Sequence, residues 1–143
     1  MKRFRFSLER VLEFRRQQEE VERALLARIA TERTRLEQLA QQQQIESREL
    51  RAVCVAEGVA VGAHVRQAYD SAAALLRRRT RSLELAGQAE QLRLQQLATV
   101  LDARRRLRLL ELLRDRQRRR HVRSTDRALE AAAAELYLAK LRR

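Results

Sequence analysis

Nucleophilic and metal-binding side chains are few in this chain, and they stand far apart in the sequence. Cys54 is the only cysteine, and the two histidines are His64 and His121. One cysteine permits neither an intrachain disulfide nor a cysteine-based zinc site, and no GxxxxGK[ST] phosphate-binding loop occurs. We therefore expect no catalytic residue, metal, cofactor or small-molecule substrate, and the protein is predicted not to be an enzyme.

Arginine is the residue type with the clearest binding chemistry. The chain of 143 residues has 32 Lys or Arg and 19 Asp or Glu, a net charge of +13. Eleven arginines and four acidic residues lie between Leu101 and Arg127, so this segment holds over half of the positive excess. Clustered arginines favour an acidic partner. The candidate docking residues for such a partner are Arg114, Arg118, Arg119, Arg120 and Arg123.

Three interpretations of this basic segment remain open. The first is a solvated helix without a dedicated partner, the second is a nucleic-acid-binding segment, and the third is a docking site for an acidic protein. Nucleic acid is disfavoured because the chain has no Asn to pair with adenine edges, and its aromatic content is 3%. Only about 16 residues follow Arg127, which is short for the zipper that a basic-region protein needs.

A membrane surface is a fourth candidate partner. All three phenylalanines, Phe4, Phe6 and Phe14, stand near Lys2 and other basic residues at the N-terminus, a combination that suits a lipid interface. We favour instead the packing of these rings on the helix that carries the basic segment. No run approaches the roughly 18 apolar residues of a membrane span, and Glu9 interrupts any signal-peptide core. The sequence therefore predicts a soluble, cytoplasmic protein.

The composition favours long helices over a globular core. Hydrophobic residues make up 45% of the chain and charged residues 36%, but aromatics are scarce and proline is absent. Such usage is typical of coiled coils, whose core is a narrow seam. The predicted fold class is all-α, with two long helices forming an antiparallel coiled-coil hairpin.

A break near Gly58 and Gly62 sets the position of the turn. Each glycine costs about 1 kcal/mol inside a helix relative to alanine, and the surrounding residues are small and uncharged. We predict one domain, 1–143, with arm one at about 8–55, a tip at about 56–64 and arm two at about 65–143. Paired residue numbers should then sum to roughly 120, so the chain beyond about 115 overhangs arm one.

Apolar residues at alternating steps of three and four mark an expected seam along each arm. Leu25 is expected on it, and Leu25→Asp is predicted to melt the paired region. On arm one the stripe comprises Val21, Leu25, Ile29, Leu36, Leu39, Gln43, Glu46, Leu50 and Val53. On arm two it comprises Tyr69, Ala73, Leu76, Thr80, Leu83, Leu94, Leu97 and Leu101, interrupted by Gly87 and Glu90.

The N-terminal segment resembles a known family. From Phe4 to Arg15 it reads FRFSLERVLEFR, followed by a Gln/Glu-rich helix beginning RQQEE at Arg16. This phrase is similar to the N-terminus of the FliJ family of flagellar type III export proteins, and the length, hairpin form and Leu/Ala-rich end from Leu129 to Leu141 also agree. A YscO-like type III secretion stalk protein is the close alternative.

The resemblance implies a binding role in protein export, flagellum biogenesis and, through motility, chemotaxis. Proteins of that family couple a hexameric export ATPase to the cytoplasmic domain of the export gate, and they escort export chaperones. The resemblance implies ATPase contacts by Phe6, Leu8, Val11, Leu12, Leu136 and Leu138. It implies gate contacts by Leu39, Gln43, Glu46, Leu50, Ala72, Leu76 and Leu83, and peripheral association with the cytoplasmic face of the inner membrane through the gate.

Overall fold

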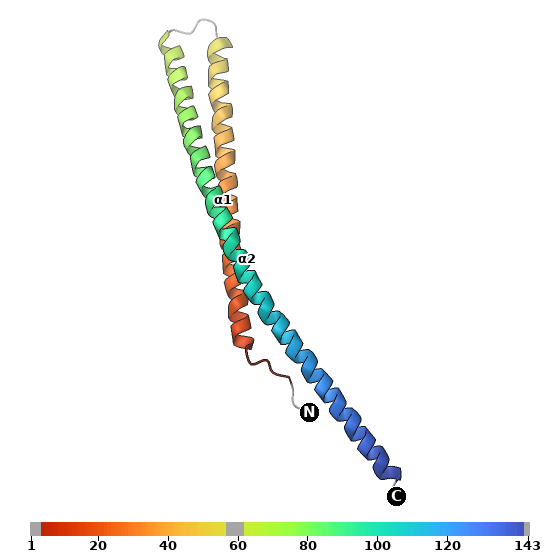
Figure 1. Ribbon diagram of the computed structural model, residues 1–143. Coiled ribbons are helices and arrows are strands. Elements are labelled where there is room, and N and C mark those ends of the chain that lie inside the picture. The colour runs from red at the N-terminus through yellow and green to blue at the C-terminus, as the bar shows by residue number, and fades with distance from the viewer. Residues whose placement is uncertain (1–3, 57–61, 142–143) are drawn as a thin grey trace. The chain divides into compact units, whose positions relative to one another are not determined.

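The computed structural model describes residues 4–56 and 62–141, which form two α-helices packed as an all-α hairpin (Figure 1). Helix α1 covers Glu9–Ala56, 48 residues, and α2 covers Gly62–Leu141, 80 residues. Cross-helix contacts such as Ser47 with Ala72 and Glu22 with Gln96 have residue numbers that sum to roughly 120. The predicted all-α hairpin is confirmed, and these two contacts agree with the predicted antiparallel pairing.

Strong helix formers and the absence of proline explain the length of both helices. Ala, Leu, Arg, Glu and Gln dominate both segments. Helix α1 begins at Glu9, where an acidic side chain suits the positive end of the helix dipole, and the amide of Leu12 donates to the Leu8 carbonyl at 2.9 Å. Lys140 lies in the last turn of α2, where a cation is favoured.

The turn is shorter than the predicted tip of 56–64. Ala56 still belongs to α1, and α2 already begins at Gly62, so residues 62–64 are helical. A glycine in the first helical turn weakens the helix less than one in its interior, because amides there lack intrahelical partners in any case. Gly58, the other glycine of the predicted break, lies outside the described residues.

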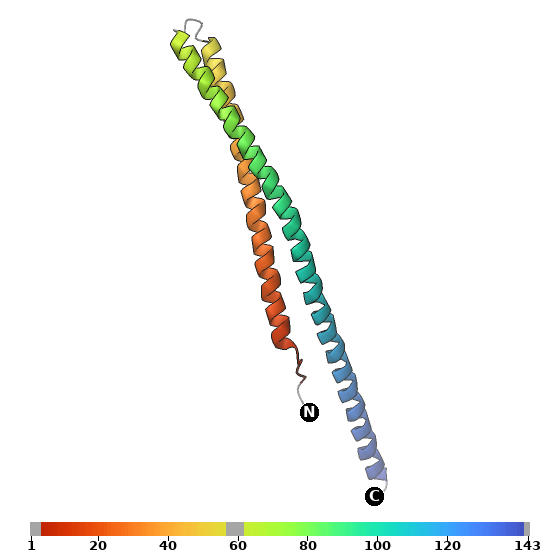
Figure 2. The ribbon, with the colours of Figure 1, turned by 60° about the vertical axis from the view of Figure 1, so that its left-hand side comes forward.

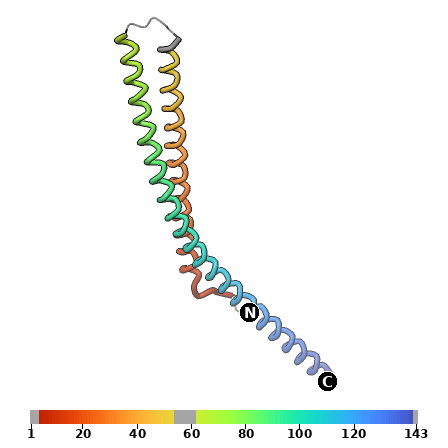
Figure 3. Tube along the Cα trace, turned by 45° about the horizontal axis from the view of Figure 1, so that its top comes forward, coloured from red at the N-terminus to blue at the C-terminus, as the bar shows by residue number. Residues whose placement is uncertain are grey.

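Packing divides the chain into two compact units, each built from one stretch of α1 and one of α2. Unit 1 comprises Met1–Val21 and Leu101–Arg143, and unit 2 comprises Glu22–Val100. In unit 2 the two helices lie side by side in the three views of Figures 1, 2 and 3.

Small residues form the buried seam of unit 2. Helix α1 contributes Ala40 and Ser47, seven residues apart, and α2 contributes Ala72, Ser82, Ala86 and Val100. In α2 the half-buried and buried positions continue at steps of three and four, which is the heptad pattern. Small side chains let the two helix backbones approach closely, so the seam is narrow and depends on close contact more than on large anchors.

The predicted apolar stripe of α2 is displaced by one residue from the buried seam. Tyr69, Leu83 and Leu94 are exposed, whereas Ala72, Ser82 and Ala86 are buried. One residue corresponds to a rotation of about 100° around a helix, so the stripe lies on the flank. The sequence prediction placed the leucines in the seam. In the structure, the two helices pack closely at the neighbouring alanine and serine positions, so these positions are buried instead.

A related correction applies to α1. Ile29, Leu36 and Leu50 are partly buried, as predicted, but Leu25 is 44% exposed. Its neighbour Leu26 occupies the seam position instead. The remaining predicted stripe residues that prove exposed are Val21, Leu39 and Val53.

Larger apolar anchors hold unit 1. Phe6 and Leu12 are buried, and so is Ala103 of α2. The rings of Phe4 and His121 lie 5.7 Å apart between centroids, so contacts reach further along α2 than the predicted limit near 115. From Asp126 to Leu141 every side chain is exposed, and Figure 2 shows this part of α2 continuing past the N-terminal segment.

Candidate functional site

A shallow, open hollow, here called the arginine groove, lies along one face of α2 in unit 1, and every residue that lines it belongs to this one helix. Its cationic residues, spaced three, four and seven apart, lie on one side of the helix. Leu112, Asp115, Arg116, Arg119, Arg120 and Arg123 line it. Among the residues that the structure describes, these four guanidinium groups have no carboxylate within 4 Å, and with Asp115 in the lining the groove keeps a net positive charge.

The structure brings together three of the five arginines predicted to dock an acidic partner. Arg119, Arg120 and Arg123 line the groove, whereas Arg118 is exposed outside its lining. Arg114 is partly buried and pairs with Glu9 of α1 at 3.5 Å. Arg116 was missed by sequence reasoning, although its spacing from Arg119 and Arg123 places it on the same helix face.

The predicted ATPase contacts divide into buried and exposed residues. Phe6 and Leu12 are in the core of unit 1, and Leu12 has no exposed area, so their side chains serve packing. Leu8 and Val11 are exposed beside them, and Leu136 and Leu138 are exposed in the last turns of α2. The available apolar surface of this set is therefore smaller than the sequence suggested.

The three phenylalanines are arranged differently from one another. Phe6 is buried and Phe4 packs on His121, as expected for rings that pack on the basic helix. Phe14 is 59% exposed, which corrects that expectation. The guanidinium of Arg15 lies 5.8 Å from the Phe14 ring centroid, a cation–π distance.

The predicted gate contacts do not form one surface. Ala72 is buried, and Gln43 accepts a hydrogen bond from Ser82 at 3.2 Å within the seam. Leu39 and Leu83 are both 42% exposed, but their heptad positions place them on opposite flanks of the two-helix unit. Glu46, Leu50 and Leu76 are partly buried.

Polar contacts within unit 2 are satisfied across the helices. The Ser47 hydroxyl donates to the Ala72 carbonyl at 3.2 Å, and the Gln96 amide donates to the Glu22 carbonyl at 3.1 Å. Among the described residues, no buried polar side-chain atom lacks a hydrogen-bond partner. These contacts favour one register over its neighbours, because a slip would leave the polar groups of the seam unpaired.

One carboxylate has a perturbed environment. Glu90 pairs with Arg93 at 2.7 Å on its own helix and with Arg33 of α1 at 3.0 Å. The hydrogen bond from Arg93 lowers the pKa of Glu90, and the charges of Arg33 and Arg93 lower it further, against an opposing desolvation effect. The same pairing raises the pKa of Arg93. The carboxylate is thus held ionised as a link between the helices.

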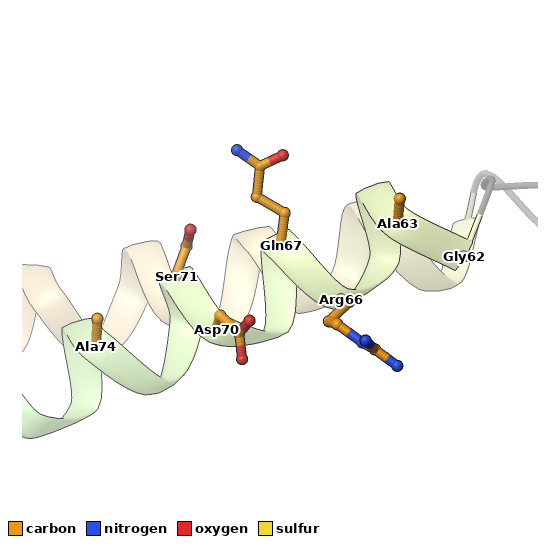
Figure 4. A pocket seen from close by; sticks show the side chains of 7 residues that line it. All are labelled: Gly62, Ala63, Arg66, Gln67, Asp70, Ser71 and Ala74. Atoms are coloured by element: carbon orange, nitrogen blue, oxygen red, sulfur yellow. The ribbon is translucent and has the colours of Figure 1, made fainter.

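A second hollow lies on the first turns of α2. Figure 4 shows side chains that project from this one helix, so the hollow is a shallow surface. The lining residues are Gly62, Ala63, Arg66, Gln67, Asp70, Ser71 and Ala74. Such a surface does not enclose a ligand.

Residues 4–56 and 62–141 contain no group of three or more His, Cys, Asp or Glu side chains able to hold a metal ion. Neither helix has a stretch apolar and long enough to cross a membrane.

Comparison with known proteins gives no match. No family model, no curated protein and no solved structure matches this chain.

Proposed function

We propose that this chain is a non-enzymatic coupling protein of a flagellar or related type III export apparatus, which binds an export ATPase, the export gate and export chaperones. The observation that carries the proposal is the packing of the N-terminal phrase onto the basic part of α2. Phe6 and Leu12 are buried in unit 1, and Phe4 lies against His121. The residues that resemble the FliJ family therefore belong to the same unit as the arginine groove.

Unit 1 is the proposed ATPase-docking region. It combines the arginine groove with exposed leucines such as Leu8 and Leu136. From the sequence, its net charge is +10, against +3 for unit 2. An acidic partner surface with apolar patches would complement it.

Unit 2 is the proposed region for the gate, through exposed leucines such as Leu39 or Leu83. Because these two lie on opposite flanks, only one flank faces the gate at a time. The proposed association with the membrane is peripheral and indirect, through the gate.

The test measures binding of the full chain to the cognate export ATPase. We expect Arg119→Glu with Arg123→Glu to weaken binding at least about tenfold, because a groove contact becomes repulsive. The matched control is Arg77→Glu with Arg81→Glu, an exposed pair with the same spacing in unit 2, which should leave binding unchanged. Point substitutions are preferable to deleting the N-terminal residues, because deletion removes the buried Phe6 and Leu12. No binding by the unsubstituted chain would overturn the proposal.

A second candidate function is nucleic-acid binding, which the one-sided arrangement of Arg116, Arg119, Arg120 and Arg123 favours. Here the same groove would contact phosphates. Binding to DNA or RNA that persists at about 200 mM salt, together with failure to bind the ATPase, would replace the leading proposal with this one.

A further inference from the structure

The flank of α2 in unit 2 carries a stripe of leucines that the hairpin covers only in part. Leu83 is 42% exposed and Leu94 is 53% exposed, whereas Leu76 and Leu97 are partly buried. We name the surface comprising Thr80, Leu83, Gly87, Glu90, Leu94 and Leu97 the leucine stripe. Its members are spaced at alternating steps of three and four, so together they form a second possible coiled-coil seam.

Gly87 lies at the middle of this stripe and is exposed. It stands in the interior of a helix, where glycine costs about 1 kcal/mol relative to alanine. A Cβ built at Gly87 would meet nothing within 4 Å, so packing inside the chain does not require glycine. A glycine on an apolar helix face allows another helix to approach closely or to insert a large side chain.

The polar members of the stripe are satisfied by their own chain. The Thr80 hydroxyl donates to the Leu76 carbonyl at 3.1 Å. The Glu90 carboxylate pairs with Arg93 and Arg33. A helix that covers the stripe would therefore leave no unmatched hydroxyl or carboxylate behind.

The stripe is complementary to itself in the antiparallel sense. A two-fold rotation about a point between Gln88 and Ala89 places a second copy of α2 antiparallel to the first. In this arrangement, Leu83 of one copy meets Leu94 of the other, Thr80 meets Leu97, and Gly87 meets Glu90. Each glycine thus provides the space that the larger glutamate of the second copy needs. Self-complementarity of this kind is what a two-fold symmetric interface requires.

We propose that two copies of this chain associate through the leucine stripe, with their α2 helices antiparallel about the point between Gln88 and Ala89. Charge also favours a second copy at this place, because unit 2 has a net charge of only +3, so two copies repel each other less here than through unit 1. The inference goes beyond the proposed function. Because the second copy covers Leu83, the flank with Leu39 is the one left for the proposed gate contact.

Sedimentation equilibrium of the full chain tests the proposal. We expect a monomer–dimer equilibrium with a Kd on the order of 10 µM, since one helix face of about 26 Å is a small interface. The double substitution Leu83→Ser with Leu94→Ser should weaken dimerisation at least about 30-fold, because apolar burial is lost. The matched control is Leu85→Ser with Leu92→Ser. These leucines lie on the other flank and are 42% and 55% exposed, so their substitution should leave the dimer Kd unchanged.

A second variant separates association from folding. Gly87→Gln introduces a better helix former, so the monomer should be at least as helical by circular dichroism. It also fills the space opposite Glu90, so dimerisation should weaken about tenfold. A Gly87→Gln chain that dimerises as tightly as the parent would overturn the proposal.

Cysteine cross-linking tests the direction of the pairing. In a Cys54→Ser background, chains with Leu83→Cys should cross-link to chains with Leu94→Cys but not to one another. Cross-linking of Leu83→Cys chains to themselves alone would overturn the antiparallel arrangement. A monomer at about 100 µM in the parent chain would overturn the whole proposal and leave the stripe to a different protein.

Discussion

Units 1 and 2 join stretches of the same two helices by different means. In unit 1, Phe6 and Leu12 are large buried anchors that hold the N-terminal segment on α2. In unit 2, the buried residues are small, such as Ala72 and Ser47, and polar contacts cross between the helices. One helix pair can therefore be closed either by a few large side chains or by a close seam of small ones.

Charge separates the two units as clearly as packing does. Unit 1 holds twenty Lys or Arg and ten acidic residues, a net charge of +10, whereas unit 2 holds twelve and nine, a net charge of +3. The more basic unit also exposes every side chain from Asp126 to Leu141. This contrast is why we propose an acidic partner for unit 1 and helix association for unit 2.

The largest predicted effect concerns the anchors of unit 1. Leu12→Ala should destabilise the packing of unit 1 by about 3 kcal/mol, because Leu12 is fully buried and a cavity would remain. Hydrogen exchange should show the loss of protection in residues 9–21 and little change near Ser47. Val11→Ala, an exposed neighbour, is the control and should change stability by less than about 0.5 kcal/mol. Equal effects of the two substitutions would contradict the assignment of the core.

The next prediction tests the phase of the seam in unit 2. Leu26→Asp places a charge at a partly buried seam position and should lower the free energy of unfolding by about 2 kcal/mol. Leu25→Asp should have less than half that effect, because Leu25 is 44% exposed. Chemical denaturation followed by circular dichroism measures both. A larger effect at position 25 would restore the stripe expected from the sequence.

A smaller effect is expected for the polar contacts of unit 2. Ser47→Ala removes the hydrogen bond to the Ala72 carbonyl and should cost about 1 kcal/mol. The exposed Ser71→Ala is the matched control, with no measurable change expected in the thermal midpoint. No effect at either position would show that small size alone, without the hydroxyl, is what the seam requires.

The smallest effect is a dependence of stability on pH through Glu90. Because its pKa is lowered in the folded chain, its contribution is complete above the ordinary value of 4.5 and is lost as the pH falls through the folded value. Glu90→Gln should therefore lower the thermal midpoint slightly at pH 7 and not at all in strong acid. The exposed Glu84→Gln should show no such difference. A gap between Glu90→Gln and the parent that persists in acid would contradict the ion-pair explanation.

Sequence reasoning located most elements but only part of the candidate site. The arginines at 119, 120 and 123 were found because charge density is visible in the sequence, and helical spacing could have added Arg116. The exposure of Leu83 could not be foreseen, since leucine is expected at a seam. Gly87 was taken as an interruption, and only the structure showed that a Cβ at this position would meet nothing within 4 Å.

The sequence by itself determined the helices, the hairpin and the place of the turn. Strong helix formers, the lack of proline and the glycines near residue 60 leave few alternatives. Only the tertiary structure decided which face of each helix is buried. Helix α2 has apolar residues on several faces, so periodicity alone allows more than one seam. The alanine and serine positions prevail because they let the backbones approach, and the larger leucines beside them are left on the flanks.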